Sequence, residues 1–354
     1  MTLLYSEVEE ELRAAVRDLL ADRCPPSAVL KRAESQAYDL DLWKTLAGEI
    51  GVAGLLIPEE HGGAGASASE VAVVLEELGR GVAPVPFFTS SVLATHALVR
   101  AGAGELLGRL ADGSATAALV VSFAASPYQP FRGASVRVED GGARLSGTVT
   151  GVAGAEVADL LLVPVDGGLY LVEGAEVRVV PSFDLTRPVA TVTLDGAAAT
   201  RVGDVDLREV LLFGAGLLAS EQYGVAQWCL DTTLAYVKER HQFARPIGSF
   251  QAIKHRLADL WLDVVRARAA ARNAAAEGSE VSAAVAQAWN SGVAVRMAEE
   301  ALQLHGGIGM TWEHPIHLYL KRAKAGEIAL GTPGDHREAL ASLVDVPGPE
   351  GGQQ

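Results

Sequence analysis

The spacing of the apolar residues changes twice along this chain, and those two changes limit the folds that it can adopt. As far as about residue 116, apolar side chains recur every three or four positions, as Leu12, Val16 and Leu19 do, which indicates amphipathic helices. From Ala117 they alternate every second position, which indicates strands, and after Leu211 the helical spacing returns. We therefore predict an α+β fold in three parts with a disordered tail: an N-terminal helical domain at 1–116, a middle antiparallel, barrel-like β domain at 117–211, a C-terminal four-helix bundle at 212–346 and the tail at 347–354.

Capping and turn residues place several of the expected elements more closely. Ser6 precedes a run of acidic residues and is expected to cap the first helix, and Ser67 or Ser69 is expected to start a later one. The turn sequence at 140–142, Asp-Gly-Gly, separates two alternating segments and predicts a hairpin. The helices of the last part are expected at 213–240, 249–276, 280–305 and 315–328, with a short final helix after Asp335.

Charge and cysteine content exclude several classes of function. The formal net charge is −15, and an acidic surface repels nucleic-acid phosphates, so we expect no nucleic-acid partner. Cys24 and Cys229 have no metal-ligand spacing and form no disulfide framework, which fits a reducing cytoplasm without a metal site. The N-terminus carries acids where a signal peptide has basic residues, and no apolar run is long enough to cross a membrane.

Two motifs in the last part carry groups suited to a nucleotide. The first is Arg-His-Gln-Phe at 240–243, in which Arg240 offers a planar fork of donors for a pyrophosphate and Phe243 offers an aromatic face. The second is Gln-Leu-His-Gly-Gly at 303–307, where the two glycines let a cofactor approach the backbone closely. Alone, an arginine on a helix is usually a solvated charge and a Gly-Gly pair usually ends a helix, so the argument depends on both motifs and their flanks.

With those flanks the chain resembles the acyl-CoA dehydrogenase family of flavoproteins over nearly its whole length. The resemblance rests on the stretches 54–63, 145–147 with Ala158-Asp159, 236–259 and 303–332. It implies that an FAD lies between two subunits, one holding the flavin ring and the acyl-CoA while its neighbour reaches the pyrophosphate and adenosine. The residues that match the reaching side are Arg240, Gln242, Phe243, Phe250, Gln251, Gln303, Gly306 and Gly307. Ala244 departs from the glycine that usually follows Gln-Phe in that family.

The positions at which the family keeps its catalytic base hold residues that cannot accept a proton. Most members have a glutamate directly before a Gly-Thr pair, which here is preceded by Leu330. A minority supply the glutamate from the first bundle helix, where this chain has Gly214. We therefore expect no catalytic residue in this chain. Glu221, Glu327 and Asp335 are the nearby acids that could act as a displaced base, although structural carboxylates are the default, since a base must reach its proton.

The positions expected to contact the flavin ring are depleted too. The family usually has an aromatic residue and a hydroxyl there, and this chain has Gly151 and Ala153. The loop at 125–132, which normally carries Gly-Ser-Asp, lacks that sequence and keeps aromatic residues instead. The residues expected to reach the FAD of a neighbouring subunit are thus retained, whereas those expected to contact the flavin ring and supply the base within this chain are not.

Two hypotheses of different classes follow. In the first, the chain is a non-catalytic subunit most like those of actinobacterial heterotetrameric acyl-CoA dehydrogenases of the steroid side-chain type. It would share FAD with a paralogous partner, in an α2β2 assembly, and the partner would carry the glutamate, hold the acyl-CoA and pass electrons on, for example to an electron-transfer flavoprotein. In the second, it is a self-sufficient homo-oligomeric flavoenzyme with a displaced base or altered oxidation chemistry. A relic without flavin is the remaining case, and flavin content separates all three.

Overall fold

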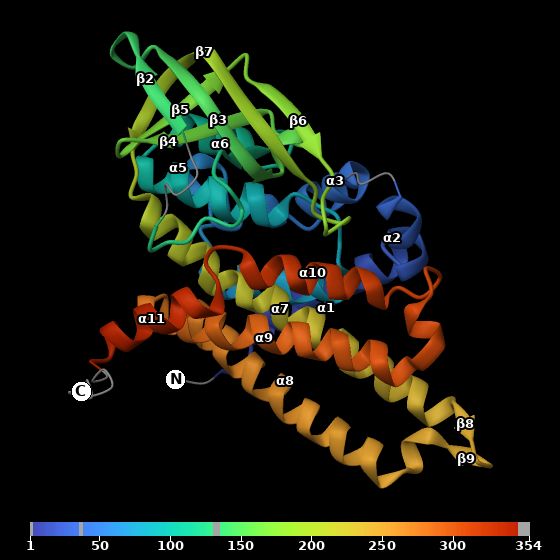
Figure 1. Cartoon of the computed structure of the whole chain (residues 1–354). Helices are drawn as coiled ribbons and strands as arrows, with labels where there is room; N and C mark the ends of the chain where they lie inside the picture. Colours follow the sequence, from blue (N-terminus) through green and yellow to red (C-terminus); the bar gives the residue numbers. More distant parts are fainter. Residues whose placement is uncertain (1–2, 35–37, 130–134, 346–354) are drawn as a thin grey trace, which may run out of the picture.

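The computed structural model describes residues 3–34, 38–129 and 135–345. It has the three predicted parts in the predicted order (Figure 1): helices, a β domain at the top of the view, and long helices that cross beneath it. The tail predicted at 347–354 and residues 130–132 of the loop without Gly-Ser-Asp lie outside the described residues.

The N-terminal part is helical, as its apolar spacing predicts. Its first helix begins after Ser6, whose hydroxyl accepts from the Glu9 N–H in a capping box. Ser67, and not Ser69, caps the later helix, through a second capping box with Glu70. The elements of this part are α1 (Glu7–Arg23), α2 (Pro26–Ala33), α3 (Leu40–Gly48), η1 (Val52–Gly54), η2 (Glu59–His61), α4 (Ala68–Gly81), the π-helix η3 (Phe87–Ala94), α5 (Thr95–Ala101) and α6 (Gly104–Leu110).

The β domain is one sheet with strand order β1-β4-β5-β7-β3-β2, and β6 also pairs with β7. The hairpin predicted around 140–142 joins β2 to β3. One pairing corrects the antiparallel expectation, because β1 runs parallel to β4, with Ala117 opposite Leu160. The elements are β1 (Ala117–Leu119), β2 (Ser135–Glu139), η4 (Asp140–Gly142), β3 (Arg144–Ala153), η5 (Ala155–Val157), β4 (Leu160–Val165), β5 (Gly168–Glu173), β6 (Glu176–Val180) and β7 (Val189–Asp204).

The C-terminal helices lie close to their predicted positions, with two corrections. The first begins at Leu207 and not at 213, because the Asp206 side chain accepts from the N–H groups of Arg208 and Glu209. The last begins at Pro333, ahead of Asp335, because Thr332 caps it. The elements are α7 (Leu207–Glu239), β8 (His241–Gln242), β9 (Arg245–Pro246), η6 (Ile247–Ser249), α8 (Gln251–Glu277), α9 (Glu280–His305), η7 (Gly306–Met310), α10 (Ile316–Ile328) and α11 (Pro333–Leu343).

Helices α4 and α7 cross with their backbones in contact, which fixes the N-terminal helices against the bundle. A Cβ at Gly79 of α4 would lie 2.2 Å from the carbonyl oxygen of Glu221, and one at Gly224 of α7 would lie 2.0 Å from that of Glu76. No side chain fits at such distances, so the crossing requires glycine on both helices. Because α7 then continues far beyond this crossing, its two ends lie in different surroundings (Figure 1).

Candidate functional site

The structure brings the two nucleotide motifs together at one end of the bundle. Tyr236 of α7 stacks on His305 of α9 with ring centroids 4.3 Å apart, and its hydroxyl donates to the His305 carbonyl at 3.2 Å. Arg240 follows α7 directly, and Gln303 lies in the last turn of α9. The β8–β9 hairpin projects from the same end, at the lower right of Figure 1. We call this region, residues 236–251 with 303–312, the open end.

The hairpin of the open end turns at two residues with positive φ. Gln242 pairs with Arg245, and between them Phe243 and Ala244 have φ of 53° and 63°. A two-residue hairpin of the primed type needs positive φ at both central positions, which side chains other than glycine adopt at a cost of about 1–2 kcal/mol each. This turn leaves the Phe243 side chain 86% exposed. The aromatic face is therefore presented outward, away from the chain's own core.

Aromatic and cationic groups surround that turn. The Phe243 ring meets Phe250 edge to face at 6.1 Å, and the Arg245 guanidinium carbon lies 3.8 Å from the centre of the Phe250 ring. Arg240 and Gln251 are exposed beside them. On a chain of net charge −15, these two arginines are a local concentration of positive charge that could attract an anion.

The glycines of the second motif face open space. Helix α9 ends at His305, and the Gly306 N–H donates to the Gln303 carbonyl while Gly306 itself has φ of 60°. A Cβ at Gly306 or at Gly307 would meet no atom within 4 Å. Ile308, Met310 and Trp312 follow with large exposed fractions of 44%, 70% and 52%. The side chain of Gln303 is exposed as well, so the motif faces solvent in this chain.

The two positions at which the resemblance leads us to expect a base, 214 and 330, lie next to each other, and hydrocarbon side chains pack between them. A Cβ at Gly214 would come within 2.4 Å of Leu93 Cδ2 and 3.0 Å of Leu330 Cδ1. Leu330 is fully buried and Leu93 nearly so. A glutamate at position 214 would have no room, and its charge would have no solvent. We call this contact of Leu93, Gly214 and Leu330 the plug.

Hydrogen bonds hold the plug in place. Leu330 has a φ of 52°, its N–H donates to the Phe123 carbonyl at 2.9 Å, and its own carbonyl contacts His336 Nε2 at 2.9 Å. The other ring nitrogen of His336 contacts the Tyr128 hydroxyl at 3.1 Å. Tyr128 comes from the loop that lacks Gly-Ser-Asp. Through Tyr128 that loop thus helps to fix the segment before Gly331.

Each of the three acids considered as a displaced base has a partner group within the chain. Glu221 is buried and accepts from Arg187 and Arg322, the latter with its Nη1 at 3.3 Å. Burial would raise the pKa of Glu221, but the two arginines outweigh it and hold that pKa below its usual value. Glu327 pairs with Lys324 at 3.7 Å.

Asp335, the third of these acids, caps α11. Its carboxylate accepts from the Thr332 N–H at 2.9 Å. Each of the three carboxylates thus interacts with a group of its own chain, and the two arginines favour the ionised form of Glu221.

The expected flavin-ring positions border a hollow that sequence reasoning did not find. The hollow has a volume of about 300 Å³, and Ser122, Phe123, Gly151, Phe183 and Ile328 are among its lining residues. Gly151 has φ of 72° and offers no ring, and Ala153 is buried and offers no hydroxyl. These two positions therefore supply neither an aromatic ring nor a hydroxyl to a flavin ring.

Buried charges close the inner wall of this hollow. Arg187 packs with its guanidinium carbon 5.5 Å from the centre of the Phe88 ring and 5.2 Å from that of Phe123, and it pairs with Glu221. Asp184 in turn pairs with Arg322 at 2.6 Å. These four charged groups tie the loop before β7 to α7 and α10. Isolated acidic and basic residues in a sequence carry no signal that they will meet in this way.

The open end and the plug are far apart in one chain. Gly214 and Glu239 lie on the same helix, α7, and its rise of about 1.5 Å per residue separates them by about 37 Å. The open end therefore lies outside the surroundings of the plug in the same chain. Within residues 3–34, 38–129 and 135–345, no helix is long and apolar enough to cross a membrane, and no group of three or more potential ligands is arranged to hold a metal.

Family models match the N-terminal and C-terminal parts of the chain, and a relative matches nearly all of it. The model of the acyl-CoA dehydrogenase N-terminal domain matches residues 6–116, and that of the C-terminal domain matches residues 206–344. The acyl-CoA dehydrogenase IpdE2 of Mycolicibacterium smegmatis is 38% identical over 340 residues, which cover 96% of this chain and 99% of the relative.

Two solved complexes contain chains of the same fold. A chain of a variant of the Tcur3481–Tcur3483 steroid ACAD superposes with a TM-score of 0.85 at 32% identity, over 97% of this chain and 99% of that chain. A chain of the ChsE4–ChsE5 complex of Mycobacterium tuberculosis superposes with a TM-score of 0.85 at 30% identity, over 98% of this chain and 100% of that chain.

Proposed function

Because this chain belongs to the acyl-CoA dehydrogenase family of FAD-dependent oxidoreductases that act on CH–CH bonds, we propose that it is the non-catalytic subunit of such an enzyme. In this proposal it completes the FAD site of a paralogous partner from across an interface, and the partner supplies the catalytic glutamate. The observation that carries the proposal is the plug, where Leu93 and Leu330 occupy the space that either base would need beside Gly214.

The proposed role of the open end follows from its exposed groups. FAD, when bound, supplies the acceptor for the hydride that leaves the β carbon of an acyl-CoA. Arg240 would bind the pyrophosphate through its guanidinium fork, and Gly306 and Gly307 would let that cofactor approach the backbone. Phe243 would offer an aromatic face to the cofactor, and Gln303 would pair with polar atoms of its adenosine or pyrophosphate. Gln242, Phe250 and Gln251 would lie around them. Each of these groups binds or orients the cofactor and none moves a proton.

The relatives support an assembly of unlike chains. The similar solved chains come from complexes whose titles name two proteins each, Tcur3481–Tcur3483 and ChsE4–ChsE5, and the first is called a steroid ACAD. By this analogy we propose an α2β2 assembly that desaturates a steroid or other bulky acyl-CoA, held mainly by the partner. An electron-transfer flavoprotein is the proposed electron acceptor, and the cytoplasm the proposed location.

The second candidate, a self-sufficient flavoenzyme, draws on one observation. The hollow of about 300 Å³ beside Gly151 lies at the position expected for the flavin ring. Its weakness is the absence of a base, because Glu221, Glu327 and Asp335 are each engaged by a partner group. This candidate would therefore require oxidation chemistry without abstraction of an α proton.

The flavin content of the purified protein separates the candidates. The full chain would be purified alone and after co-expression with an acyl-CoA dehydrogenase paralogue that has the glutamate, and flavin absorbance and mass would be measured for both. A colourless lone chain and a yellow complex with one flavin per unlike pair support the proposal. A yellow lone chain that an acyl-CoA bleaches contradicts it, and flavin in neither sample indicates a relic.

A further inference from the structure

The two motifs of the open end follow different helices, and a pair of stacked rings joins those helices at their ends. Arg240 follows α7, and its N–H donates to the Tyr236 carbonyl at 2.9 Å. Gly306 follows α9 directly after His305. The Tyr236 ring stacks on the His305 ring with an interplanar angle of 23°, and the Tyr236 hydroxyl donates to the His305 carbonyl at 3.2 Å. Each residue of the pair is thus bonded to the backbone that leads into one motif.

His305 is held in one orientation by its own surroundings. The residue is 2% exposed, and its Nδ1 lies 2.7 Å from the Ala301 carbonyl, so Nδ1 carries the proton of the uncharged ring. The His314 ring packs against it with ring centroids 4.7 Å apart. Burial lowers the pKa of His305, which favours the uncharged ring at neutral pH. His305 therefore gives Tyr236 a fixed surface on which to pack.

The segments beyond this pair are exposed, so their positions depend on how their bases are anchored. The Arg240 carbonyl accepts from the Ile247 N–H at 2.8 Å, which ties the hairpin to the end of α7 but not to α9. The Arg240 side chain is exposed, and Gly306 and Gly307 border open space. A guanidinium fork binds phosphate oxygens with a defined geometry, and a displacement of about 1 Å is enough to weaken such a contact. An anchor between the two helix ends can therefore control binding without touching the ligand.

We propose that Tyr236 and His305 are positioning residues, which hold Arg240 and the two glycines at the spacing that one pyrophosphate group requires. This inference rests on the proposed function, because it concerns the FAD site that the open end would complete. The Tyr236 hydroxyl is already bonded to the His305 carbonyl, so the pair acts through the two motifs and not as a ligand of the cofactor. If the pair did no more than pack the helices together, its loss would lower stability without changing the contribution of Arg240.

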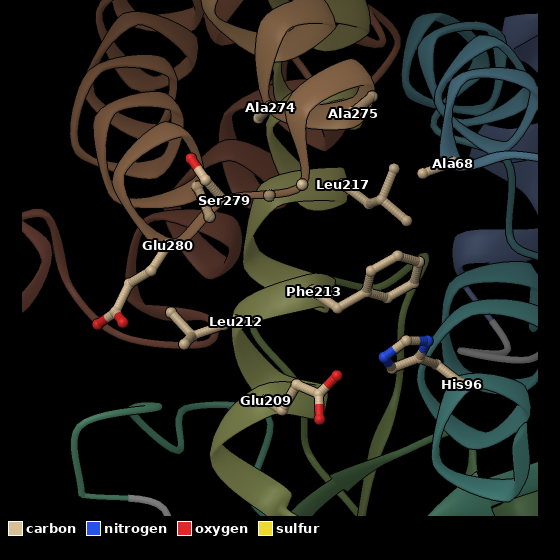
Figure 2. A pocket seen from close by; sticks show the side chains of 13 residues that line it. Ala68, His96, Glu209, Leu212, Phe213, Leu217, Ala274, Ala275, Ser279 and Glu280 are labelled. Atoms are coloured by element: carbon tan, nitrogen blue, oxygen red, sulfur yellow. The ribbon is translucent and has the colours of Figure 1, made fainter. Parts of the chain in front are cut away.

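A second aromatic–histidine pair on the same helix provides a matched control. Phe213 of α7 stacks on His96 of α5 with ring centroids 3.9 Å apart. Figure 2 shows the two side chains beside one another at a cavity of about 240 Å³ near the start of α7. The helical rise of about 1.5 Å per residue places Phe213 about 35 Å from Tyr236 along the helix. Loss of the Phe213 ring should therefore leave the open end unaffected.

The test measures the dissociation constant of FAD for the complex of the full chain with its paralogous partner. Tyr236→Phe removes the hydroxyl and keeps the stack, and it should weaken FAD binding about fivefold. Tyr236→Leu removes both and should weaken it about twentyfold. Phe213→Leu should leave the dissociation constant unchanged. The mass of each complex and the thermal unfolding of each lone chain are measured alongside, and the weaker FAD binding is expected in complexes that still assemble.

Double variants separate positioning from packing. In the Tyr236→Leu chain the guanidinium of Arg240 should already be displaced, so Arg240→Ala should weaken FAD binding at least about threefold less than it does in the wild-type chain. In the Phe213→Leu chain the effect of Arg240→Ala should keep its wild-type size. Where Tyr236→Leu does not fold, Tyr236→Phe decides by the same comparison, with a difference of at least about twofold. Equal effects of Arg240→Ala in all of these chains overturn the inference.

The outcomes also distinguish a failure of this inference from a failure of the proposed function. If Arg240→Ala weakens FAD binding but neither variant of Tyr236 does, the proposed function stands and the positioning role is refuted. If the wild-type complex binds no FAD, both are refuted. Weaker FAD binding by an assembled Tyr236→Phe complex, together with a reduced effect of Arg240→Ala, supports both.

Discussion

The two ends of helix α7 differ in how far their residues are exposed to solvent. At its C-terminal end Arg240 is exposed, Phe243 is 86% exposed, and the nearby glycines of the second motif border open space. At its N-terminal end Gly214 packs against Leu93 and Leu330 with no room for a further atom. The first end leaves several polar and aromatic side chains exposed, whereas the second is fully packed by side chains of the chain itself. Substitutions at the open end should therefore weaken flavin retention and leave the stability of the chain unchanged. Substitutions near the plug should lower stability and have no direct effect on flavin retention.

The largest expected effect is on stability, from Glu221→Ala. The substitution leaves Arg187 and Arg322 buried without the carboxylate that both contact, and removing one partner of a buried ion pair costs about 3–5 kcal/mol. Urea denaturation of the full chain would measure the change in the free energy of unfolding. Glu338→Ala, at an exposed position of α11, is the matched control and should change it by less than about 0.5 kcal/mol.

The contribution of the Glu221 carboxylate to stability depends on pH. The pKa of Glu221 is lower in the folded chain than its usual value of 4.5. Its contribution to the free energy of unfolding is therefore present above pH 4.5 and is lost as the pH falls through the pKa of the folded chain. Wild-type stability should fall in that acidic window more steeply than that of Glu221→Ala. Equal pH profiles, or a loss of less than about 1 kcal/mol at neutral pH, would show that the ion pairs do not stabilise the region around the hollow.

The next effect concerns an attempt to restore a base with Leu330→Glu. The new carboxylate would be buried beside Leu93, so we expect the chain to lose about 3 kcal/mol and to gain no activity. Leu330→Met conserves volume and should cost less than about 1.5 kcal/mol. Acyl-CoA-dependent bleaching of added FAD, with thermal unfolding alongside, measures both quantities. A folded Leu330→Glu chain that oxidises an acyl-CoA by itself would show that the plug does not exclude a base and substrate from this region.

The sequence reveals the open end far better than the plug, because the signals of the open end are local. Arg240 and Gln303 lie in short motifs, and Tyr236 and His305, which join them, are within five residues of these positions. The helices and most strands follow from apolar spacing and from caps such as Ser6 and Ser67, which act on the next few residues.

The plug combines three segments that are distant in sequence. Gly214 and Leu330 are visible as residues that replace a base, but nothing local to Leu93 indicates that it fills the space between them. The partners of Glu221 and the parallel pairing of β1 with β4 depend on tertiary packing in the same way. The positive φ of Ala244 is likewise hidden, because no glycine marks that turn.

At the open end the expected effect of Arg240→Ala is on flavin. Loss of a charge-assisted contact to the pyrophosphate should weaken flavin retention by the co-purified complex on the order of tenfold to a hundredfold. Stability of the lone chain should not change, because no ion pair within the described part of the chain involves this side chain. Arg337→Ala, at an exposed arginine of α11, is the control. If both variants retain flavin equally, Arg240 does not bind it.

The smallest expected effect is a gain in stability at the open end, from Ala244→Gly. The left-handed conformation of Ala244 costs about 1–2 kcal/mol, and glycine removes that cost while losing about 0.4–1 kcal/mol through the entropy of the unfolded chain. The net gain should be about 0.5 kcal/mol. Ala269→Gly, at an exposed position in the middle of α8, should have the opposite sign and lose about 1 kcal/mol, since glycine weakens a helix interior. Thermal unfolding of both variants provides the comparison. A loss of stability in Ala244→Gly would mean that the turn is not strained. The exposed position of Phe243 would then have no cost in stability that a bound partner must offset.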